Sequence, residues 1–364
     1  MAQLDNITIK GYKSIKLLEK FNLAPLNILI GANGAGKSNF IGLFDLLHQV
    51  IEGNLQLTVA KSGGADSFLH FGQKHTDKIE ITLWFGQNGY GLELLPAKDS
   101  LIIESEIVYF HDKKTYPAPY SEGIGSALSE SLLKKKAKES QGRIAKYVIK
   151  STENWRVYHF QDTSTTAKVK QQCDLGDNSF LRSDASNLAA FLYLLSETKK
   201  KYYNNIADTI RMVAPFFGDF LLRPSPFNKD KIKLEWQEKN SDAYFDAHSL
   251  SDGTLRFICL VTLLLQPELP ETILLDEPEL GLHPYAINVL ADLLKTASQR
   301  AQVIVSTQSV TLVNQFIPED IVIVDRKEGA SLFRRPSPKD ISNWLDEYGL
   351  GDLWEKNIIG GRPA

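Results

Sequence analysis

The sequence predicts an α/β fold in which a mixed β-sheet is flanked by helices, with an antiparallel β lobe and a short helical insertion. Three observations lead to this prediction. A glycine-rich turn, Gly31 to Ser38, stands between an apolar strand and an apolar helix. A second apolar run, Thr272 to Leu275, ends in the acids Asp276 and Glu277. Between these ends lie segments that alternate apolar and polar residues, a pattern that indicates strands with one buried face.

The glycine-rich turn has the context of a phosphate-binding loop. Ile28 to Ile30 is a short apolar strand, and apolar residues at helical spacing follow the turn. Glycines let successive N–H groups face phosphate oxygens, and the helix N-terminus adds partial positive charge. The pattern directs Lys37 to the β- and γ-phosphates and Ser38 to Mg²⁺. The competing interpretation is a chance glycine-rich turn before a helix. The residues expected to bind the nucleotide here are Asn33, Gly34, Gly36, Lys37, Ser38 and Asn39.

The acids after the second apolar run fit the hydrolytic side of the same site. An acid at the end of a buried strand is costly to ionise without a nearby cation, and Mg²⁺ supplies that charge. Asp276 is expected to hold the metal through its water shell, and Glu277 to orient and deprotonate the attacking water. The plain alternative is a solvated strand end. Glu279 is either a further acidic site residue or a charge at a helix N-terminus.

A serine and a glycine stand at another helix start. Ser251 and Gly253 precede an apolar helix, where free N–H groups can bind an anion. By itself this pattern is an ordinary helix cap. Its place shortly before the Asp276 strand favours a role in the nucleotide site.

Taken together, these motifs resemble an ABC-type P-loop NTPase head of the SMC/RecF-like class. Within that class the chain resembles the compact bacterial AAA-like ATPases related to the overcoming-lysogenisation-defect (OLD) group. Three further segments carry this resemblance, besides the phosphate loop and the segment from Leu250 to Thr254. They are Ile7 to Ser14, Leu275 to Pro284 and Val305 to Ser309, and the closing Gly349 to Trp354 and Ile358 to Gly361 also look typical.

The resemblance implies a mechanism with ATP and Mg²⁺ as cofactors. Two heads would pair head-to-tail around two ATPs, with Ser251 and Gly253 contacting the γ-phosphate held by the other subunit. Lys37, Ser38, Asp276 and Glu277 would act on the nucleotide of their own subunit. ATP rather than GTP is assigned by the resemblance alone.

Two departures from the family pattern bear on turnover. Asp252 stands where transporter-type heads usually have Gly, and Gln308 stands where ABC heads usually place a switch histidine. An amide can donate and accept hydrogen bonds but carries no charge, so hydrolysis is expected to be slow or ATP to serve as a clamp. Gln308 is nevertheless expected among the catalytic residues, with Glu277 and Lys37.

Two side chains have one functional and one plain interpretation each. Gln161, after the apolar run from Trp155 to Phe160, is either the glutamine that reaches Mg²⁺ and the attacking water or a surface residue. The expected metal ligands are therefore Ser38, Asp276 and Gln161. His283 either contacts the second head or caps its own helix.

Length and composition set the class of protein. The chain has 364 residues, of which 43% are hydrophobic, and a net charge of −3. This charge does not indicate nucleic-acid binding, although a local basic patch would suffice for it. Two cysteines, Cys173 and Cys259, form no disulfide framework or zinc pattern. We find no signal peptide and no membrane-spanning run, so we expect a cytoplasmic protein without membrane contact.

The motifs at both ends favour one composite head. We expect this head over 1–110 and 245–335, an inserted middle lobe or helical lid over 111–245, and a tail over 336–364 that packs on the head or on a partner. Lys134 to Lys136 is either a DNA-facing tip or a solvated helix face. Trp344, Tyr348 and Trp354 in the tail either pack on the head or meet a partner.

Three functions remain open at this stage. The first is a slow ATPase in DNA repair or antiphage defence, paired as a homodimer or higher even oligomer, with nucleic acid left open as a partner. OLD relatives carry a C-terminal Toprim nuclease, whereas roughly 55 residues follow Gln308, short of an ordinary domain. We therefore expect any effector or nuclease to be a separate protein. The second is an ATP-clamped scaffold with negligible turnover, and the third is the nucleotide subunit of a transporter.

Overall fold

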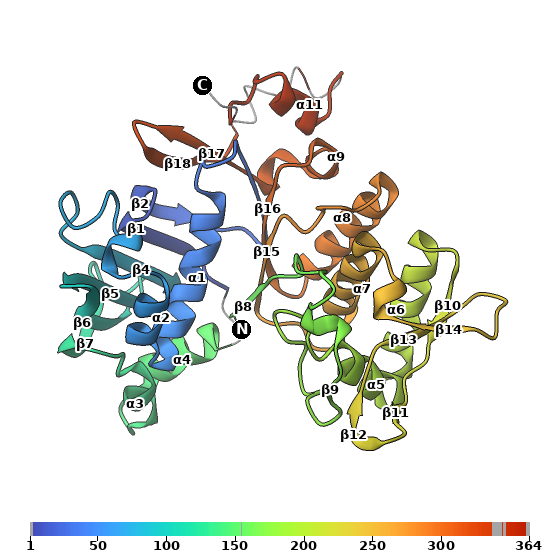
Figure 1. Ribbon diagram of the computed structural model, residues 1–364. Helices are drawn as coiled ribbons and strands as arrows, with labels where there is room; N and C mark the ends of the chain where they lie inside the picture. The colour runs from blue at the N-terminus through green and yellow to red at the C-terminus, as the bar shows by residue number, and fades with distance from the viewer. Residues whose placement is uncertain (1–2, 154, 337–343, 345–346, 362–364) are drawn as a thin grey trace.

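A central β-sheet joins two lobes in the computed structural model, which describes residues 3–153, 155–336, 344 and 347–361. An antiparallel β lobe lies on one side of this sheet and a helical lobe on the other (Figure 1). The strand order is β18-β17-β3-β16-β15-β8, and every neighbouring pair is parallel except β17 with β18. The strands are β3 (Leu26–Ile30), β8 (Trp155–Tyr158), β15 (Thr272–Asp276), β16 (Gln302–Thr307), β17 (Ile321–Lys327) and β18 (Ala330–Arg334).

Both faces of the central sheet are covered, which explains why its inner strands read as continuous apolar runs. Successive side chains of a strand point to opposite faces. Ile28 and Ile30 of β3 therefore join the core of the helical lobe, and Leu29 between them joins the core of the antiparallel lobe. All five residues of β3 are buried, as are all six of β16.

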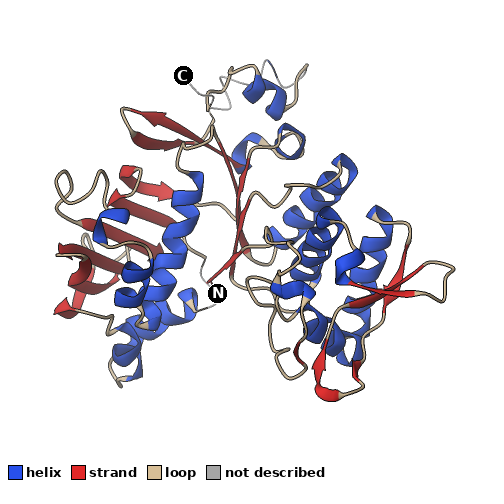
Figure 2. Cartoon of the chain, viewed as in Figure 1, coloured by secondary structure: helices blue, strands red, loops and turns tan. Residues whose placement is uncertain are grey.

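The antiparallel lobe has the strand order β2-β1-β4-β5-β6-β7. Helix α1 (Lys37–Glu52) lies between this sheet and the central one, and Figure 2 shows strands gathered beside it. Phe44 of α1 is fully buried, and its ring centroid lies 5.0 Å from that of Trp155 in β8. The remaining elements of this lobe are β1 (Asn6–Tyr12), β2 (Ile15–Asn22), α2 (Leu55–Lys61), β4 (Ile79–Phe85), β5 (Asn88–Ala97), β6 (Ser100–Phe110), β7 (Tyr120–Leu128), α3 (Leu133–Lys138) and α4 (Arg143–Thr152).

The helical lobe packs on the other face of the central sheet, and two small antiparallel sheets border it. Its helix α7 packs against both α6 and α8. Its helices are α5 (Leu188–Thr198), α6 (Lys200–Val213), α7 (Asp252–Leu265), α8 (Pro284–Ser298) and α9 (Val310–Val313). Its strands are β9 (Cys173–Asp174), β10 (Phe217–Phe220), β11 (Pro224–Ser225), β12 (Asn228–Ile232), β13 (Glu235–Glu238) and β14 (Tyr244–Asp246).

Two segments expected in a separate middle lobe instead extend the sheets of the head. β8 pairs in parallel with β15, with Trp155 opposite Thr272, and β7 pairs with β6 at the edge of the antiparallel sheet. The boundary of 111–245 therefore does not match the sheet topology. β8 has only four residues, and its partner strand is more than a hundred positions away, so nothing local in the sequence reveals the pairing.

The lysine run in α3 forms ion pairs within its own lobe. Lys134 pairs with Glu52 at 2.5 Å, and Lys136 with Glu122 at 2.8 Å and Glu139 at 2.9 Å. These contacts match the solvated helix face rather than a free basic tip.

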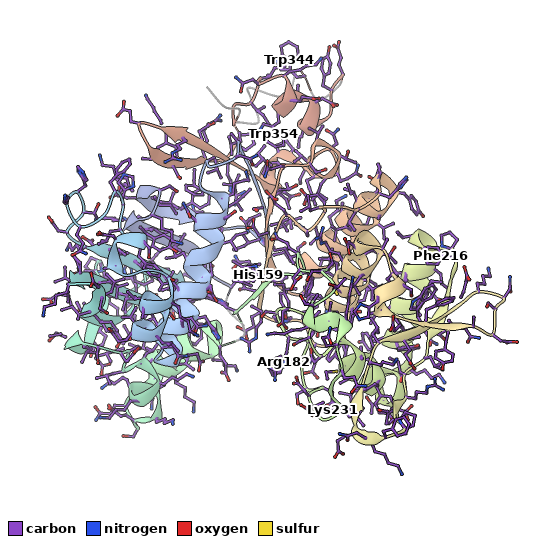
Figure 3. The ribbon with its side chains drawn as sticks, in the orientation of Figure 1. His159, Arg182, Phe216, Lys231, Trp344 and Trp354 are labelled. Carbon is purple, nitrogen blue, oxygen red and sulfur yellow. The ribbon has the colours of Figure 1, made fainter. Side chains whose placement is uncertain are left out.

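The described part of the C-terminal tail packs against α9 and β17. Helix α11 (Leu350–Glu355) buries Leu353 and Trp354, and the Gly361 N–H donates to Asp325 at 2.7 Å. Trp344 lies at the outer end of this region, farther from the sheet than Trp354 (Figure 3), and is 43% exposed. Other parts of the expected tail, 337–343, 345–346 and 362–364, lie outside the described residues.

Candidate nucleotide site

The glycine-rich turn connects β3 to α1 and has the backbone of a phosphate loop. Gly34 and Gly36 have φ values of 76° and 114°, a region that favours glycine. Gly36 also stands against Ser331 and Ser14, whose hydroxyls a Cβ at this position would overlap. Asn33 and Gly34 are exposed at the tip of the loop. The turn therefore needs glycine both for its conformation and for its close packing on β18.

Lys37 is folded onto this loop. It is 5% exposed, and its Nζ donates to the carbonyl oxygens of Gly31 at 2.6 Å and Ala32 at 3.1 Å. Burial lowers the pKa of Lys37, while the carboxylates of Glu277, Asp276 and Glu279 act in the opposite direction. The ammonium group thus has main-chain partners where phosphate oxygens would compete for it.

Asp276 and Ser38 meet although 238 positions separate them. Ser38 Oγ donates to Asp276 Oδ1 at 3.3 Å, and Ser306 Oγ donates to the same oxygen. Gln161 lies beside them, since its Nε2 donates to the main-chain oxygen of Asp276 at 2.9 Å. The three expected metal ligands are therefore adjacent. A hydroxyl and a carboxylate oxygen at this separation suit Mg²⁺, which prefers oxygen ligands.

Glu277 and Gln308 form the next pair along the same sheet edge. Glu277 has a φ of 46°, and its N–H donates to Ser306 O at 2.9 Å. Gln308 Nε2 donates to Glu277 Oε1. The expected base and the residue at the switch position are thus in direct contact.

Glu279 is a buried acid and does not begin a helix, since α8 begins at Pro284. Its Oε1 accepts hydrogen bonds from Thr307 Oγ1 and from the N–H of Gln308 at 3.2 Å. Of the two interpretations left open by the sequence, the structure favours a place in the site.

The segment from Ser251 to Thr254 forms the N-terminus of α7. Ser251 caps the helix, because its Oγ accepts from the N–H of Thr254 at 3.2 Å. A Cβ on Gly253 would overlap the main-chain oxygen of Gly281. Among the described residues, Ser251 makes side-chain hydrogen bonds only to Thr254, so its expected contact with a second subunit stays a prediction.

Two other expected site residues have contacts within the subunit. His283 caps α8, its Nδ1 accepting from the N–H of Tyr285 at 3.2 Å, which matches the plain interpretation. Asn39 Nδ2 donates to Ser14 Oγ at 2.7 Å, and Ser331 Oγ donates to the same hydroxyl at 2.7 Å. A role for Asn39 in nucleotide binding stays a prediction.

Sequence reasoning missed Arg256, which joins three segments of the site. Its guanidinium donates to the carbonyls of Phe160 at 3.1 Å, Gln161 at 3.1 Å and Leu280. Arg256 is 6% exposed, and burial lowers its pKa. Nothing in an apolar helix sequence reveals such a contact, because its acceptors are main-chain oxygens.

Ser306 and Arg326 were also missed. Ser306 stands one residue before the end of β16 and lies opposite Asp276 in parallel register. Arg326 Nη1 donates to the Gly34 carbonyl at 3.1 Å. A polar residue at the carboxyl end of a buried strand could have indicated Ser306, since such ends meet at one edge of a parallel sheet.

One cavity is lined by other residues than these. It has a volume of about 570 Å³ and is bordered by the second half of α1, by Arg156 of β8 and by the loop that contains Arg182. In the described part of the chain, no helix is long and apolar enough to cross a bilayer.

This chain is similar to a family of AAA domains and to a phage nuclease. The family described as "AAA domain, putative AbiEii toxin, Type IV TA system" matches residues 26–314. The Old nuclease of Escherichia phage P2 is 23% identical over 397 aligned positions, which cover 95% of this chain. The chain spans 62% of the length of that relative.

Two solved structures show the same fold at low sequence identity. An SMC head bound to the C-terminal winged-helix domain of ScpA has a TM-score of 0.58 and 16% identity, over 94% of this chain and 99% of that chain. An Smc head with an extended coiled coil, bound to the C-terminal domain of ScpA derived from Pyrococcus furiosus, has a TM-score of 0.54 and 14% identity, over 95% and 99%. The chain therefore belongs to the AAA-domain family that matches it, and it has the fold of the SMC heads.

Proposed function

We propose that this protein binds and slowly hydrolyses ATP with Mg²⁺, and that two copies pair through their nucleotide-bound heads. The observation that carries the proposal is the meeting of Ser38 with Asp276 at 3.3 Å, beside the contact of Gln308 with Glu277. These side chains come from both ends of the chain and gather at one edge of the sheet. Such gathering serves phosphoryl transfer, in which catalysis is mostly positioning and charge stabilisation.

Each residue has a defined role in this proposal. Mg²⁺, when bound, would neutralise charge on the phosphates, and Ser38 and Asp276 would hold it with Gln161 beside them. When ATP binds, the ammonium group of Lys37 exchanges the carbonyl oxygens of Gly31 and Ala32 for phosphate oxygens. Glu277 orients the attacking water and accepts its proton.

Pairing of heads is supported by the exposed N-terminus of α7. Ser251 is exposed there, and Leu280 and Tyr285 near it are 53% and 48% exposed. Large exposed apolar side chains are typical of interaction surfaces. We propose a homodimer or a higher even oligomer in which Ser251 and Gly253 contact the nucleotide of the second subunit.

The proposed biological setting draws on the similar proteins. A related nuclease and the toxin description of the family support a cytoplasmic role in DNA repair or antiphage defence. We propose that the ATPase holds or triggers a separate effector or nuclease, with nucleic acid as a candidate trigger.

One observation favours a second candidate, an ATP-clamped scaffold that encloses a partner with negligible turnover. Gln308 occupies the switch position, and its side-chain amide donates a hydrogen bond to Glu277 Oε1. The expected base is therefore bound to a neutral group and not to a charged one.

Light scattering and phosphate release distinguish the two candidates. The wild type and Glu277→Gln are compared with and without ATP–Mg²⁺, and Glu197→Gln on the exposed surface of α5 serves as control. If the protein hydrolyses ATP, we expect ATP-dependent dimers of both the wild type and Glu277→Gln. ATP turnover should fall about 10²- to 10⁴-fold in Glu277→Gln and stay unchanged in Glu197→Gln. ATP-dependent dimers without any phosphate release would support the scaffold, and assembly that ignores ATP would contradict both.

A further inference from the structure

Glu279 binds the main chain of Gln308, the residue whose side chain binds the expected base Glu277. Its Oε1 accepts from Thr307 Oγ1 and from the main-chain N–H of Gln308 at 3.2 Å. At its other end, Gln308 donates its side-chain amide to Glu277 Oε1. Gln308 is therefore bound by one carboxyl group at its backbone and by another at its side chain.

The second oxygen of Glu279 has no partner among the described residues. Glu279 is 8% exposed, and its Oε2 is buried without a hydrogen-bond donor there. A buried anion in this position would lack half of the hydrogen bonds that a carboxylate accepts in water. A protonated carboxyl group places a neutral hydroxyl at Oε2 and keeps Oε1 as the acceptor.

The charged groups around Glu279 do not neutralise it. Burial is the largest cause that raises the pKa of Glu279, and the charge of Glu277 in the same loop raises it further. The hydrogen bonds from Thr307 and Gln308 lower this pKa. Lys37 of α1 and Arg256 of α7 are the cations that face it. Both direct their donors to main-chain carbonyl oxygens, and neither forms an ion pair with Glu279 in the described part of the chain.

We propose that Glu279 is a positioning residue that acts in its neutral, protonated form, fixing the backbone at Gln308 so that the Gln308 amide stays on Glu277. This inference rests on the proposed ATPase function. It makes Glu279 part of the device that replaces a charged switch histidine: a neutral acid orients a neutral amide, and Glu277 alone carries the negative charge beside the water.

Two substitutions separate positioning from charge. Glu279→Gln keeps an acceptor oxygen for both donors and never ionises, whereas Glu279→Ala removes the acceptor. We expect Glu279→Gln to keep kcat within about threefold of wild type, the size of one net hydrogen bond. Glu279→Ala should lower kcat about 10- to 100-fold, as loss of an orienting partner does, with KM for ATP unchanged.

Glu271 provides a matched control, because it precedes β15 whereas Glu279 follows this strand. Glu271, directly before β15, also has buried carboxyl oxygens without a partner in the described residues, and burial raises its pKa. Glu271→Gln should leave kcat and KM unchanged. Infrared difference spectra give a readout that needs no turnover, since the band of a protonated carboxyl at neutral pH should be present in wild type and lost in Glu279→Gln.

Each result decides the inference. Loss of turnover in Glu279→Gln equal to that in Glu279→Ala would show that the negative charge is required, and unchanged kcat in both would show that Glu279 positions nothing. Absence of the infrared band would show that Glu279 is ionised, even if Glu279→Ala fails to fold. A wild type without phosphate release refutes the proposed ATPase instead, and the infrared result still decides the state of Glu279.

Discussion

Replacing Arg256 by Ala should loosen the contact between α7 and the segments that follow β8 and β15. The guanidinium donates to the carbonyls of Phe160, Gln161 and Leu280, and it is 6% exposed. Three lost hydrogen bonds at about 1 kcal/mol each amount to about 3 kcal/mol of unfolding free energy. Relief of the buried charge offsets part of this loss, and the three carbonyls left without donors add to it.

Thermal unfolding without nucleotide measures the effect. At roughly 2 °C per kcal/mol for a large domain, Arg256→Ala should lower Tm by about 6 °C. Arg256→Lys keeps the charge but not the planar fork that reaches several acceptors, so it should lie between wild type and Ala. Arg143→Ala is the control, because the Arg143 side chain is exposed and makes no hydrogen bond to other described residues. A Tm for Arg256→Ala equal to that of this control would refute the reasoning.

Two further substitutions test packing and pH dependence. Gly253→Ala places a Cβ against Gly281 O, so it should cost about 1–3 kcal/mol in urea unfolding. Gly176→Ala, with open space around it, should cost less, and equal costs would contradict the close approach. Burial raises the pKa of Glu271, so its folded carboxyl binds its proton more tightly and wild-type stability falls as pH rises. Glu271→Gln should therefore exceed wild-type Tm near about pH 8 and match it near about pH 4, whereas a constant difference would contradict burial of the charge.

The fold was largely predictable because its signals are local. Apolar and polar residues alternate over 79–84 and 101–110, and these segments form β4 and β6. The apolar run at 272–275 forms β15. Apolar residues at helical spacing continue from Leu188 to Ile210, yet this segment forms two helices, α5 and α6, with a break at Lys199. Periodicity does not show such a break, because the apolar face continues on both sides of it.

The sequence by itself determined the pieces of the site. The glycines, Lys37 and Ser38 lie within one short loop, and Asp276 with Glu277 ends one strand, so spacing alone assigns their chemistry. Only the tertiary structure decided that Ser306, Arg256 and Glu279 belong with them, as well as the place of Gln161. Their partners are main-chain groups or side chains on other segments. A strand order of β3-β16-β15-β8 brings the ends of these strands to one edge of the sheet. Local patterns record which faces are buried, but they do not record which strands are neighbours.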